Sequence, residues 1–393
     1  IAYMDIDNFK DINDSVGHHA GDVLLKHLAD CLRAEIVEPD VVARTGGDEF
    51  AVLFLNKSLE DVYEGLENII SRIGATWTYD KRLFYLTFTF GIVRYPEHGE
   101  SSNILYKNAD IAVYAGKRQG KNRIVLYNEK FAEDNLHIIK RTTDLQYAIE
   151  NDQFILFYQP QYELSTGAII GIEALARWNH PEEGLLLPSD FIPLAERTGH
   201  IYKLDRLIFK MALDQKKVLE DKGYTELSLS INLSTKTLTS EIDFKKLESL
   251  IDQYAIDFSK IIIEVTESAG IDDEDLVSRN LRQLKSYGVR IALDDFGTGY
   301  SSLNKLKAFP IDVIKLDKTF IKAIPGDGID NYLIKNIVDL ARDLKYNVIA
   351  EGIETKEQLE YLKEKVEGWG QGFLLSKPLS SSVLEVLLEE SFT

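Results

Sequence analysis

Two adjacent carboxylates end a segment with strand character in residues 289–303, VRIALDDFGTGYSSL. Asp294 and Asp295 follow the apolar run, and a loop with two glycines and small hydroxyl residues comes next. Like charges side by side repel each other, so a cation must compensate them. Carboxylate and Asn oxygens suit Mg²⁺ or Mn²⁺ rather than zinc. The pair therefore predicts a site for hard divalent cations.

Polar residues end other apolar runs from about residue 152 onward. Seven such runs, each followed by a helical segment, end in Glu173, Asn232, Glu264, Asp294, Lys315, Glu351 and Gln371. Repeated βα units over about 240 residues predict an α/β fold with a (β/α)8 barrel of the triosephosphate isomerase type. The strand ends of such a barrel meet at one mouth, where active sites lie. An isolated polar strand end is the alternative at any one position, but seven together favour a shared site.

The chemistry expected at this mouth is hydrolysis of a phosphodiester. Two metal ions about 3.5–4 Å apart would activate a water and neutralise the charge that develops on the phosphate. Because Asp294 and Asp295 are adjacent, one carboxylate could bridge both ions while the other completes a ligand shell. Lys315 would hold the nucleophilic water or stabilise the charged transition state.

Composition limits the classes of protein to consider. A chain of 393 residues is too long for one ordinary core, so we expect two domains, and 45% hydrophobic with 28% charged residues indicates a soluble protein. The net charge of −19 argues against a nucleic-acid polymer as partner, but allows a small phosphorylated ligand. One cysteine, Cys31, excludes an internal disulfide and a Cys-rich zinc site. We expect a cytoplasmic location, although Ile1 is not an initiator Met and upstream segments could anchor the protein to a membrane.

The first 127 residues alternate strand-like and helix-like segments. In VVARTGGDEFAVLF, Gly46 and Gly47 lie between two β runs, which predicts a hairpin. In MDIDNFKDINDSVGHHAGD, Asp5 and Asp7 end another strand. A tight turn with ordinary exposed acids is one interpretation; Mg²⁺ held for a nucleoside triphosphate is the other. Residues 128–150 are expected to form a helical linker, so the predicted domains are 1–127 and 151–393.

The C-terminal motifs resemble those of EAL domains, phosphodiesterases that linearise cyclic di-GMP to pGpG. They include YQP at 158–160, EALARW at 173–178, NLS at 232–234, EVTES at 264–268 and DDFGTGYSSL at 294–303. KLD at 315–317, AEGIET at 350–355 and QGFLLSKP at 371–378 complete the set. The family often has Gly-Cys where this chain has Val366 and Glu367.

The resemblance implies a role for each matching residue. Catalysis is implied for Glu173, Lys315 and Glu351, and two Mg²⁺ or Mn²⁺ ions are implied on Glu173, Asn232, Glu264, Asp294, Asp295, Glu351 and Gln371. Substrate contacts are implied for Gln159, Arg177 and Glu354, and Glu267 would stabilise the loop of residues 296–302. Every metal ligand is kept, which favours hydrolysis; a receptor that binds cyclic di-GMP without turnover is the alternative.

The N-terminal motifs resemble those of GGDEF domains, diguanylate cyclases with a palm-like fold that join two GTP molecules. The resemblance implies that Asp5, the Ile6 carbonyl and Asp48 bind Mg²⁺ and that Asp48 and Glu49 are catalytic. GTP contacts are implied for Lys10, Asn13, Asp22, Lys117 and Lys121. The family's upstream segment DxLTGLxNR is absent, the inhibitory RxxD reads VEPD at 37–40, and Lys121 replaces an arginine. We therefore expect an incomplete domain that synthesises cyclic di-GMP or binds GTP to regulate the barrel, within a homodimer that carries an upstream sensory domain.

Overall fold

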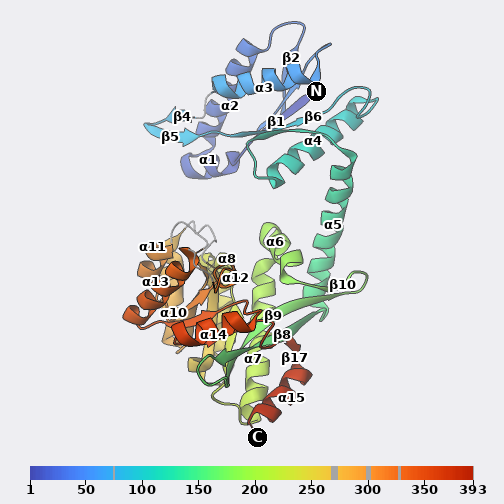
Figure 1. Cartoon of the computed structure of the whole chain (residues 1–393). Coiled ribbons are helices and arrows are strands. Elements are labelled where there is room, and N and C mark those ends of the chain that lie inside the picture. Colours follow the sequence, from blue (N-terminus) through green and yellow to red (C-terminus); the bar gives the residue numbers. More distant parts are fainter. Residues whose placement is uncertain (74–75, 267–272, 298–301, 326–328, 393) are drawn as a thin grey trace. The chain divides into compact units, whose positions relative to one another are not determined.

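The computed structural model of this chain describes residues 1–73, 76–266, 273–297, 302–325 and 329–392. The chain divides into two compact units, Ile1–Arg141 and Thr142–Thr393, called here the N-terminal and C-terminal units (Figure 1). The long helix α5 (Glu129–Glu150) contains the division, in the segment expected to be a helical linker. Within the described residues, every helix is too short or too polar to cross a membrane.

The N-terminal unit is a mixed five-stranded sheet of order β2-β3-β1-β6-β7, in which only β6 and β7 are parallel. Its elements are β1 (Ala2–Ile6), α1 (Phe9–Val16), α2 (His18–Glu35), β2 (Val41–Gly46), β3 (Glu49–Leu53), α3 (Leu59–Ile73), β4 (Thr76–Tyr79), β5 (Arg82–Tyr85), β6 (Phe88–Ile92), α4 (Ser102–Arg118) and β7 (Arg123–Leu126). The predicted hairpin between β2 and β3 is present, and β4 pairs with β5 in a separate ribbon.

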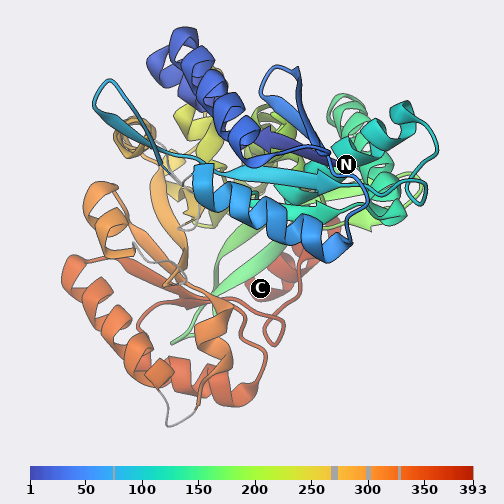
Figure 2. The same cartoon turned by 90° about the horizontal axis from the view of Figure 1, so that it is seen from above.

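Alternation along β1 decides what each face of this sheet contacts. Met4 packs in a core with Leu28 of α2 and Leu66 of α3, which cover one face (Figure 2). Tyr3 packs on the opposite face, in a second core with Ala109 of α4. Because strand side chains alternate, Asp5 shares the α4 face with Tyr3.

The C-terminal unit is a closed eight-stranded barrel, which confirms the predicted architecture. Strands β8, β9, β11, β12, β13, β14, β15 and β16 pair in this order, and β16 pairs with β8 to close the ring. The elements are β8 (Phe154–Glu163), β9 (Ile169–His180), β10 (Gly184–Leu186), α6 (Pro188–Thr198), α7 (Ile201–Asp221), β11 (Ser228–Asn232), α8 (Thr235–Thr239), α9 (Glu241–Ile251), a 3₁₀ turn (Phe258–Lys260), β12 (Ile261–Thr266), α10 (Glu274–Ser286), β13 (Arg290–Phe296), α11 (Ser302–Ala308), β14 (Val313–Leu316), α12 (Lys318–Lys322), α13 (Ile329–Leu344), β15 (Asn347–Ala350), α14 (Lys356–Lys365), β16 (Trp369–Gly370), β17 (Leu379–Ser380) and α15 (Ser381–Phe392).

One strand departs from an all-parallel (β/α)8 barrel. β8 runs antiparallel to both of its neighbours, β9 and β16. Only residues 164–168 separate β8 from β9, and a connection this short can join antiparallel strands but cannot make a parallel crossover.

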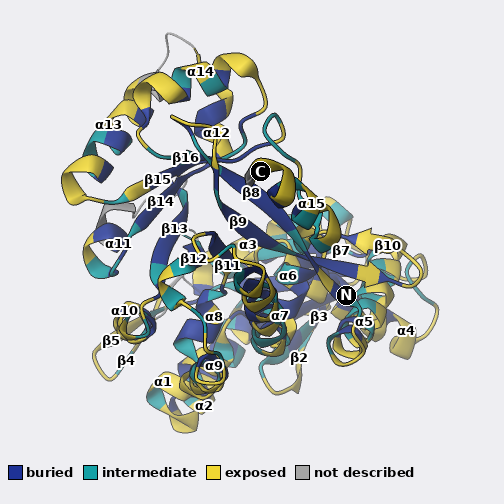
Figure 3. Ribbon diagram, turned by 90° about the horizontal axis from the view of Figure 1, so that it is seen from below, coloured by how far each residue is buried: buried dark blue, intermediate teal, exposed yellow. Residues whose placement is uncertain are grey.

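The barrel interior is built in layers. Ile262, Ala292, Val313 and Ile349 form a buried apolar cluster with Trp369 packed against it. Side chains two residues further along a strand point to the same side, so each of these strands next presents a polar residue: Glu264, Asp294, Lys315, Glu351 and Gln371. The strands are buried whereas the surrounding helices expose their outer faces (Figure 3). The apolar layer therefore forms the floor of a polar site.

Candidate active site

Lys315 on β14 is the centre of the polar layer. It is 1% exposed, and its Nζ lies 2.6 Å from Glu264 Oε2 and 2.7 Å from Glu351 Oε1. Two further carboxylates lie close, with Asp294 Oδ1 at 3.4 Å and Glu173 Oε1 at 3.6 Å. Burial acts to lower the pKa of Lys315, but Asp294 and the other carboxylates raise it well above its ordinary value. Lys315 is therefore a permanent cation surrounded by four acids.

Two amides connect the remaining strand ends to this cluster. Gln371 Nε2 donates to Glu173 Oε2 at 2.6 Å and to Glu351 Oε1 at 2.9 Å. Asn232 Nδ2 donates to Glu173 Oε1 at 2.9 Å. The structure thus joins all seven predicted strand-end residues in one network of hydrogen bonds and ion pairs.

The acids of the cluster differ in how firmly they hold a proton. Burial acts to raise the pKa of Glu173, but Lys315 and the two amide donors lower it below its ordinary value. Burial and then the charge of Glu173 raise the pKa of Glu264 well above its ordinary value. Burial also raises the pKa of Glu351, to about 8. One lysine cannot neutralise four buried carboxylates, so further positive charge would be accommodated here.

The donor set at the mouth fits hard cations. Oxygens of Asp294, Asp295 and Glu351 lie within 4.8 Å of one another, and this is the one group of three or more such ligands found among the described residues. Glu264 Oε1 is buried without a hydrogen-bond partner. Asp295 has a left-handed backbone, with φ 54°, and burial followed by Asp294 raises its pKa to about 6. An all-oxygen set with an unpartnered carboxylate oxygen is what Mg²⁺ or Mn²⁺ requires.

Strands β8 and β9 extend the site beyond the cluster. Gln159 pairs with Glu173 across these strands, and its Nε2 donates to the Ser376 carbonyl at 3.1 Å. Arg177 is 7% exposed, and burial lowers its pKa. Its Nη1 donates to the Ala176 carbonyl, and its Cζ lies 5.5 Å from the centre of the Phe157 ring. The guanidinium is thus buried beside a ring and a carbonyl, neither of which carries a negative charge.

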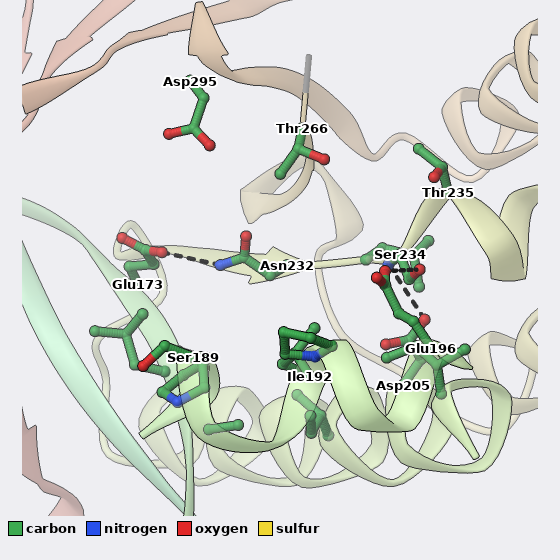
Figure 4. A pocket seen from close by; sticks show the side chains of 18 of the residues that line it. Glu173, Ser189, Ile192, Glu196, Asp205, Asn232, Ser234, Thr235, Thr266 and Asp295 are labelled. Atoms are coloured by element: carbon green, nitrogen blue, oxygen red, sulfur yellow. Dashed lines mark hydrogen bonds between the residues drawn. The ribbon is translucent and has the colours of Figure 1, made fainter. Parts of the chain in front are cut away.

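A cavity of about 620 Å³ opens beside the cluster and includes Glu173, Asn232 and Asp295 in its lining (Figure 4). Its far wall is formed by α6, α7 and α8, with Glu196, Asp205 and Ser234 (Figure 4). Asp205 accepts hydrogen bonds from Thr237 Oγ1 at 2.6 Å and the Ser234 N–H at 3.2 Å. Burial raises its pKa to about 7. A cavity this large, with acids at both ends, can hold a dinucleotide-sized ligand that donates hydrogen bonds.

Among the described residues, Glu354 lies outside this network. Glu354 is exposed in the segment before α14, where its N–H donates to Gln358 Oε1. Glu267 and residues 298–301 of the loop that it was expected to stabilise lie outside the described residues. The role of Glu267 stays a prediction.

The expected metal residues of the N-terminal unit lie at the end of β1 and in the β2–β3 turn. Asp5 Oδ1 lies 2.6 Å from Lys117 Nζ of α4. Burial raises the pKa of Asp5, and Asp48 is one of the nearby acids that add to this effect. Asp48 is half-buried in the turn, whereas the Glu49 carboxylate accepts a hydrogen bond from Tyr3. The charge of Asp48 thus acts on Asp5, as it would between neighbouring ligands of one metal site.

The expected GTP contacts occupy different environments. Asn13 Oδ1 is buried without a hydrogen-bond partner, beside Gly21. Asp22 and Lys10 are exposed, and Lys121 Nζ donates to Asn8 Oδ1 at 2.5 Å. The side-chain carbonyl oxygen of Asn13 is thus available to accept a hydrogen bond from a ligand, such as one from the amino group of guanine.

Sequence reasoning missed Gln161 and Phe157. Gln161 is fully buried, and its Nε2 donates to Gln371 Oε1 at 3.1 Å, which orients that amide. The alternation in YQPQY could have identified it, since Gln161 follows Gln159 by two positions on the same strand face. Phe157 gives no such signal, because a phenylalanine in a strand is usually part of a core.

Comparison with known proteins identifies the class to which this fold and site belong. The chain belongs to the EAL family: the domain described as "EAL domain" matches residues 142–378. Residues 1–123 match "Diguanylate cyclase, GGDEF domain". Both resemblances inferred from the sequence motifs are therefore confirmed.

Individual relatives share this two-domain arrangement. The chain is 35% identical to the bifunctional diguanylate cyclase/cyclic di-GMP phosphodiesterase MucR of Pseudomonas aeruginosa, over 98% of this chain and 56% of MucR. It is 34% identical to the cyclic di-GMP phosphodiesterase PdeR of Escherichia coli, over 98% of this chain and 58% of PdeR. A solved structure of the MucR phosphodiesterase in complex with c-di-GMP has a TM-score of 0.58 and 38% identity, covering 62% of this chain and 98% of that one. The chain thus spans little more than half the length of these curated relatives.

Proposed function

We propose that the C-terminal barrel hydrolyses cyclic di-GMP to linear pGpG with two Mg²⁺ or Mn²⁺ ions. The observation that carries this proposal is the cluster around Lys315, in which one buried cation faces four carboxylates next to the oxygens of Asp294, Asp295 and Glu351. EAL relatives named as cyclic di-GMP phosphodiesterases support the substrate.

Each group of the cluster has a role in this reaction. The ions, when bound, would supply water activation and neutralise charge on the phosphodiester. Glu173, Asn232, Glu264, Asp294 and Asp295 would hold them, with Glu351 and Gln371 completing the shell. Lys315 would stabilise negative charge at the reacting phosphate. Arg177, buried beside Phe157 and the Ala176 carbonyl, would donate to a phosphate oxygen through its planar fork.

A turnover assay tests this proposal. The protein is incubated with Mn²⁺ and cyclic di-GMP, and the products are separated by chromatography. We expect pGpG from the unmodified chain and a loss of at least about 100-fold in rate for Glu173→Ala. Glu226→Ala, which removes an exposed acid 84% accessible to solvent, is the matched control and keeps the full rate. Tight binding of cyclic di-GMP without any pGpG would instead establish the receptor alternative.

We further propose that the N-terminal unit binds GTP with Mg²⁺, through Asp5, the Ile6 carbonyl and Asp48 on the metal and Asn13 and Asp22 on guanine. The pair formed by Asp5 and Lys117 and the unpartnered Asn13 oxygen support this. Titration calorimetry should show GTP binding that Asp22→Ala weakens and Asp30→Ala does not. Synthesis of cyclic di-GMP, homodimerisation and an upstream sensory domain are proposals for the longer protein, to be tested by the same assays on that chain.

A further inference from the structure

A buried phenol in the N-terminal unit holds one acid of the GGDEF motif. Tyr3 is 1% exposed, and its hydroxyl donates to Glu49 Oε2 at 2.6 Å. Tyr3 precedes Asp5 by two positions on β1. Ala51, which lies on the same strand as Glu49, pairs directly with Tyr3. Neither the sequence motifs nor the proposed GTP site assigns a role to this residue.

The hydrogen atoms of the network can be assigned from the contacts. Tyr3 has one hydroxyl proton, and a carboxylate can only accept, so that proton goes to Glu49. The Tyr106 hydroxyl, 2.6 Å from the Tyr3 oxygen, must then be the donor in that contact. The Thr45 hydroxyl lies within hydrogen-bond distance of the Tyr3 oxygen, at 3.1 Å, and of the Glu49 carbonyl oxygen, at 3.3 Å, and donates its one proton to one of them. Donors on the Tyr3 oxygen polarise its O–H bond and strengthen its hydrogen bond to Glu49.

Asp5 lies directly opposite Glu49 in the pairing of β1 with β3, so the two acids share one face of the sheet. The hydrogen bond from Tyr3 holds one oxygen of the Glu49 carboxylate there. Partial burial and then Glu49 raise the pKa of Asp110 on α4. As these described residues lie in the structure, oxygens of Asp5, Asp48 and Glu49 do not all come within 4.8 Å of one another.

We propose that Tyr3 is a positioning residue that holds the Glu49 carboxylate away from the divalent-ion site of Asp5 and Asp48. This inference rests on the proposed metal and GTP site, and it adds that the hydrogen bond from Tyr3 restrains the third acid, Glu49. Two carboxylates bind a divalent ion more weakly than three. The Tyr3–Glu49 hydrogen bond therefore keeps the affinity of the site for a divalent ion lower than it would be with all three acids as ligands.

Removing one hydroxyl tests the proposal. Tyr3→Phe keeps the ring in the core with Ala109 but frees Glu49. Mn²⁺ alone is titrated and free Mn²⁺ is followed by electron paramagnetic resonance. Every protein compared is a full chain that carries Asp294→Asn and Asp295→Asn, which weaken the barrel site equally in all of them. We expect the dissociation constant to fall about tenfold in Tyr3→Phe. Adding Glu49→Gln should restore it to within about twofold of the starting protein.

Tyr127→Phe is the matched control, since Tyr127 lies in the same core and its described ring contact is with His98. It should change Mn²⁺ affinity by less than about twofold. Unchanged or weaker Mn²⁺ binding in Tyr3→Phe would overturn the inference, as would a gain that survives Glu49→Gln. GTP titration of the parent chain separates the two proposals: no GTP binding there, with the tenfold Mn²⁺ effect present, removes the GTP function and leaves the role of Tyr3 intact.

Discussion

Lys315 Nζ lies 2.6 Å from Glu264 Oε2 at the centre of the barrel, where the lysine is 1% exposed and the glutamate side chain is fully buried. A buried cation with carboxylates on several sides stabilises a cluster that would otherwise repel itself. One cation favours the charged form of nearby carboxylates, but it cannot offset the mutual repulsion of all four.

Lys315→Met should make the barrel dependent on metal for its stability. Breaking a buried ion pair costs about 3 kcal/mol or more, so the free energy of unfolding in EDTA should fall by about that amount. Mn²⁺ should restore more stability to this variant than to the unmodified protein, because it replaces the lost charge. Urea unfolding with and without Mn²⁺ measures both effects. Lys363→Met, which breaks a surface pair with Glu360, should change the free energy of unfolding by less than about 1 kcal/mol; an equal loss in the two variants would contradict the argument.

Metal binding at the mouth should release protons and strengthen as pH rises. Burial raises the pKa of Glu351 to about 8, and burial with Asp294 raises that of Asp295 to about 6. A protonated carboxyl group must lose its proton before it can ligate an ion. The apparent affinity for Mn²⁺ should therefore increase between pH 6 and 8, and change less above that range. Calorimetry in buffers of different ionisation enthalpy measures the number of protons released on binding. An affinity for Mn²⁺ that does not change between pH 6 and 8 would show that Glu351 and Asp295 do not lose protons when the ion binds.

The polar layer of the barrel could be predicted from the sequence because it follows from local alternation. Glu264 and Asp294 each stand two positions after an apolar residue that faces the interior, so the apolar runs alone located them. Contacts between strands could not be predicted in this way. The cation–π contact of Arg177 with Phe157 and the hydrogen bond of Tyr3 to Glu49 each join residues of two paired strands. Such contacts depend on which residues lie opposite each other across the sheet, and the sequence of one strand alone does not show this. The antiparallel β8 was missed for a related reason, since its short connection to β9 was not recognised as a hairpin.

Phe157 should support substrate binding through Arg177. A cation–π contact at a desolvated site contributes about 1–2 kcal/mol, so Phe157→Leu should raise KM for cyclic di-GMP about tenfold and leave kcat within about twofold. Phe157→Tyr keeps a ring and should behave like the unmodified protein. Combining Phe157→Leu with Arg177→Ala should give a KM no higher than Arg177→Ala alone. Additive effects in this double-mutant cycle would show that Phe157 acts independently of the guanidinium.

Asp205 should make the barrel less stable as pH rises through neutrality. Burial raises its pKa from 3.8 to about 7, so the folded state favours the protonated acid. Its stabilising contribution is complete below pH 4 and is lost as pH rises through 7. Asp205→Asn keeps an acceptor for Thr237 but does not titrate, so it should gain up to about 4 kcal/mol relative to the parent between pH 4 and pH 8. Urea unfolding at both pH values measures this difference. Asp339→Asn, at an exposed helix pair, should show no such pH dependence.

Gly21→Ala should weaken GTP binding by displacing Asn13. A methyl group at position 21 would lie 2.0 Å from Asn13 Oδ1 and 3.0 Å from Phe9 Cζ, so the Asn13 side chain must move. Since Asn13 is proposed to recognise guanine, we expect at least about a tenfold loss of GTP affinity by calorimetry, with Mg²⁺ held constant. Gly65→Ala is the matched control, because its methyl group would meet nothing closer than Phe54 at 3.8 Å. Gly65 lies inside α3, where alanine is favoured over glycine by up to about 1 kcal/mol, so that variant should melt at a higher temperature and bind GTP normally. If both variants bind GTP equally well, Asn13 does not contact the nucleotide.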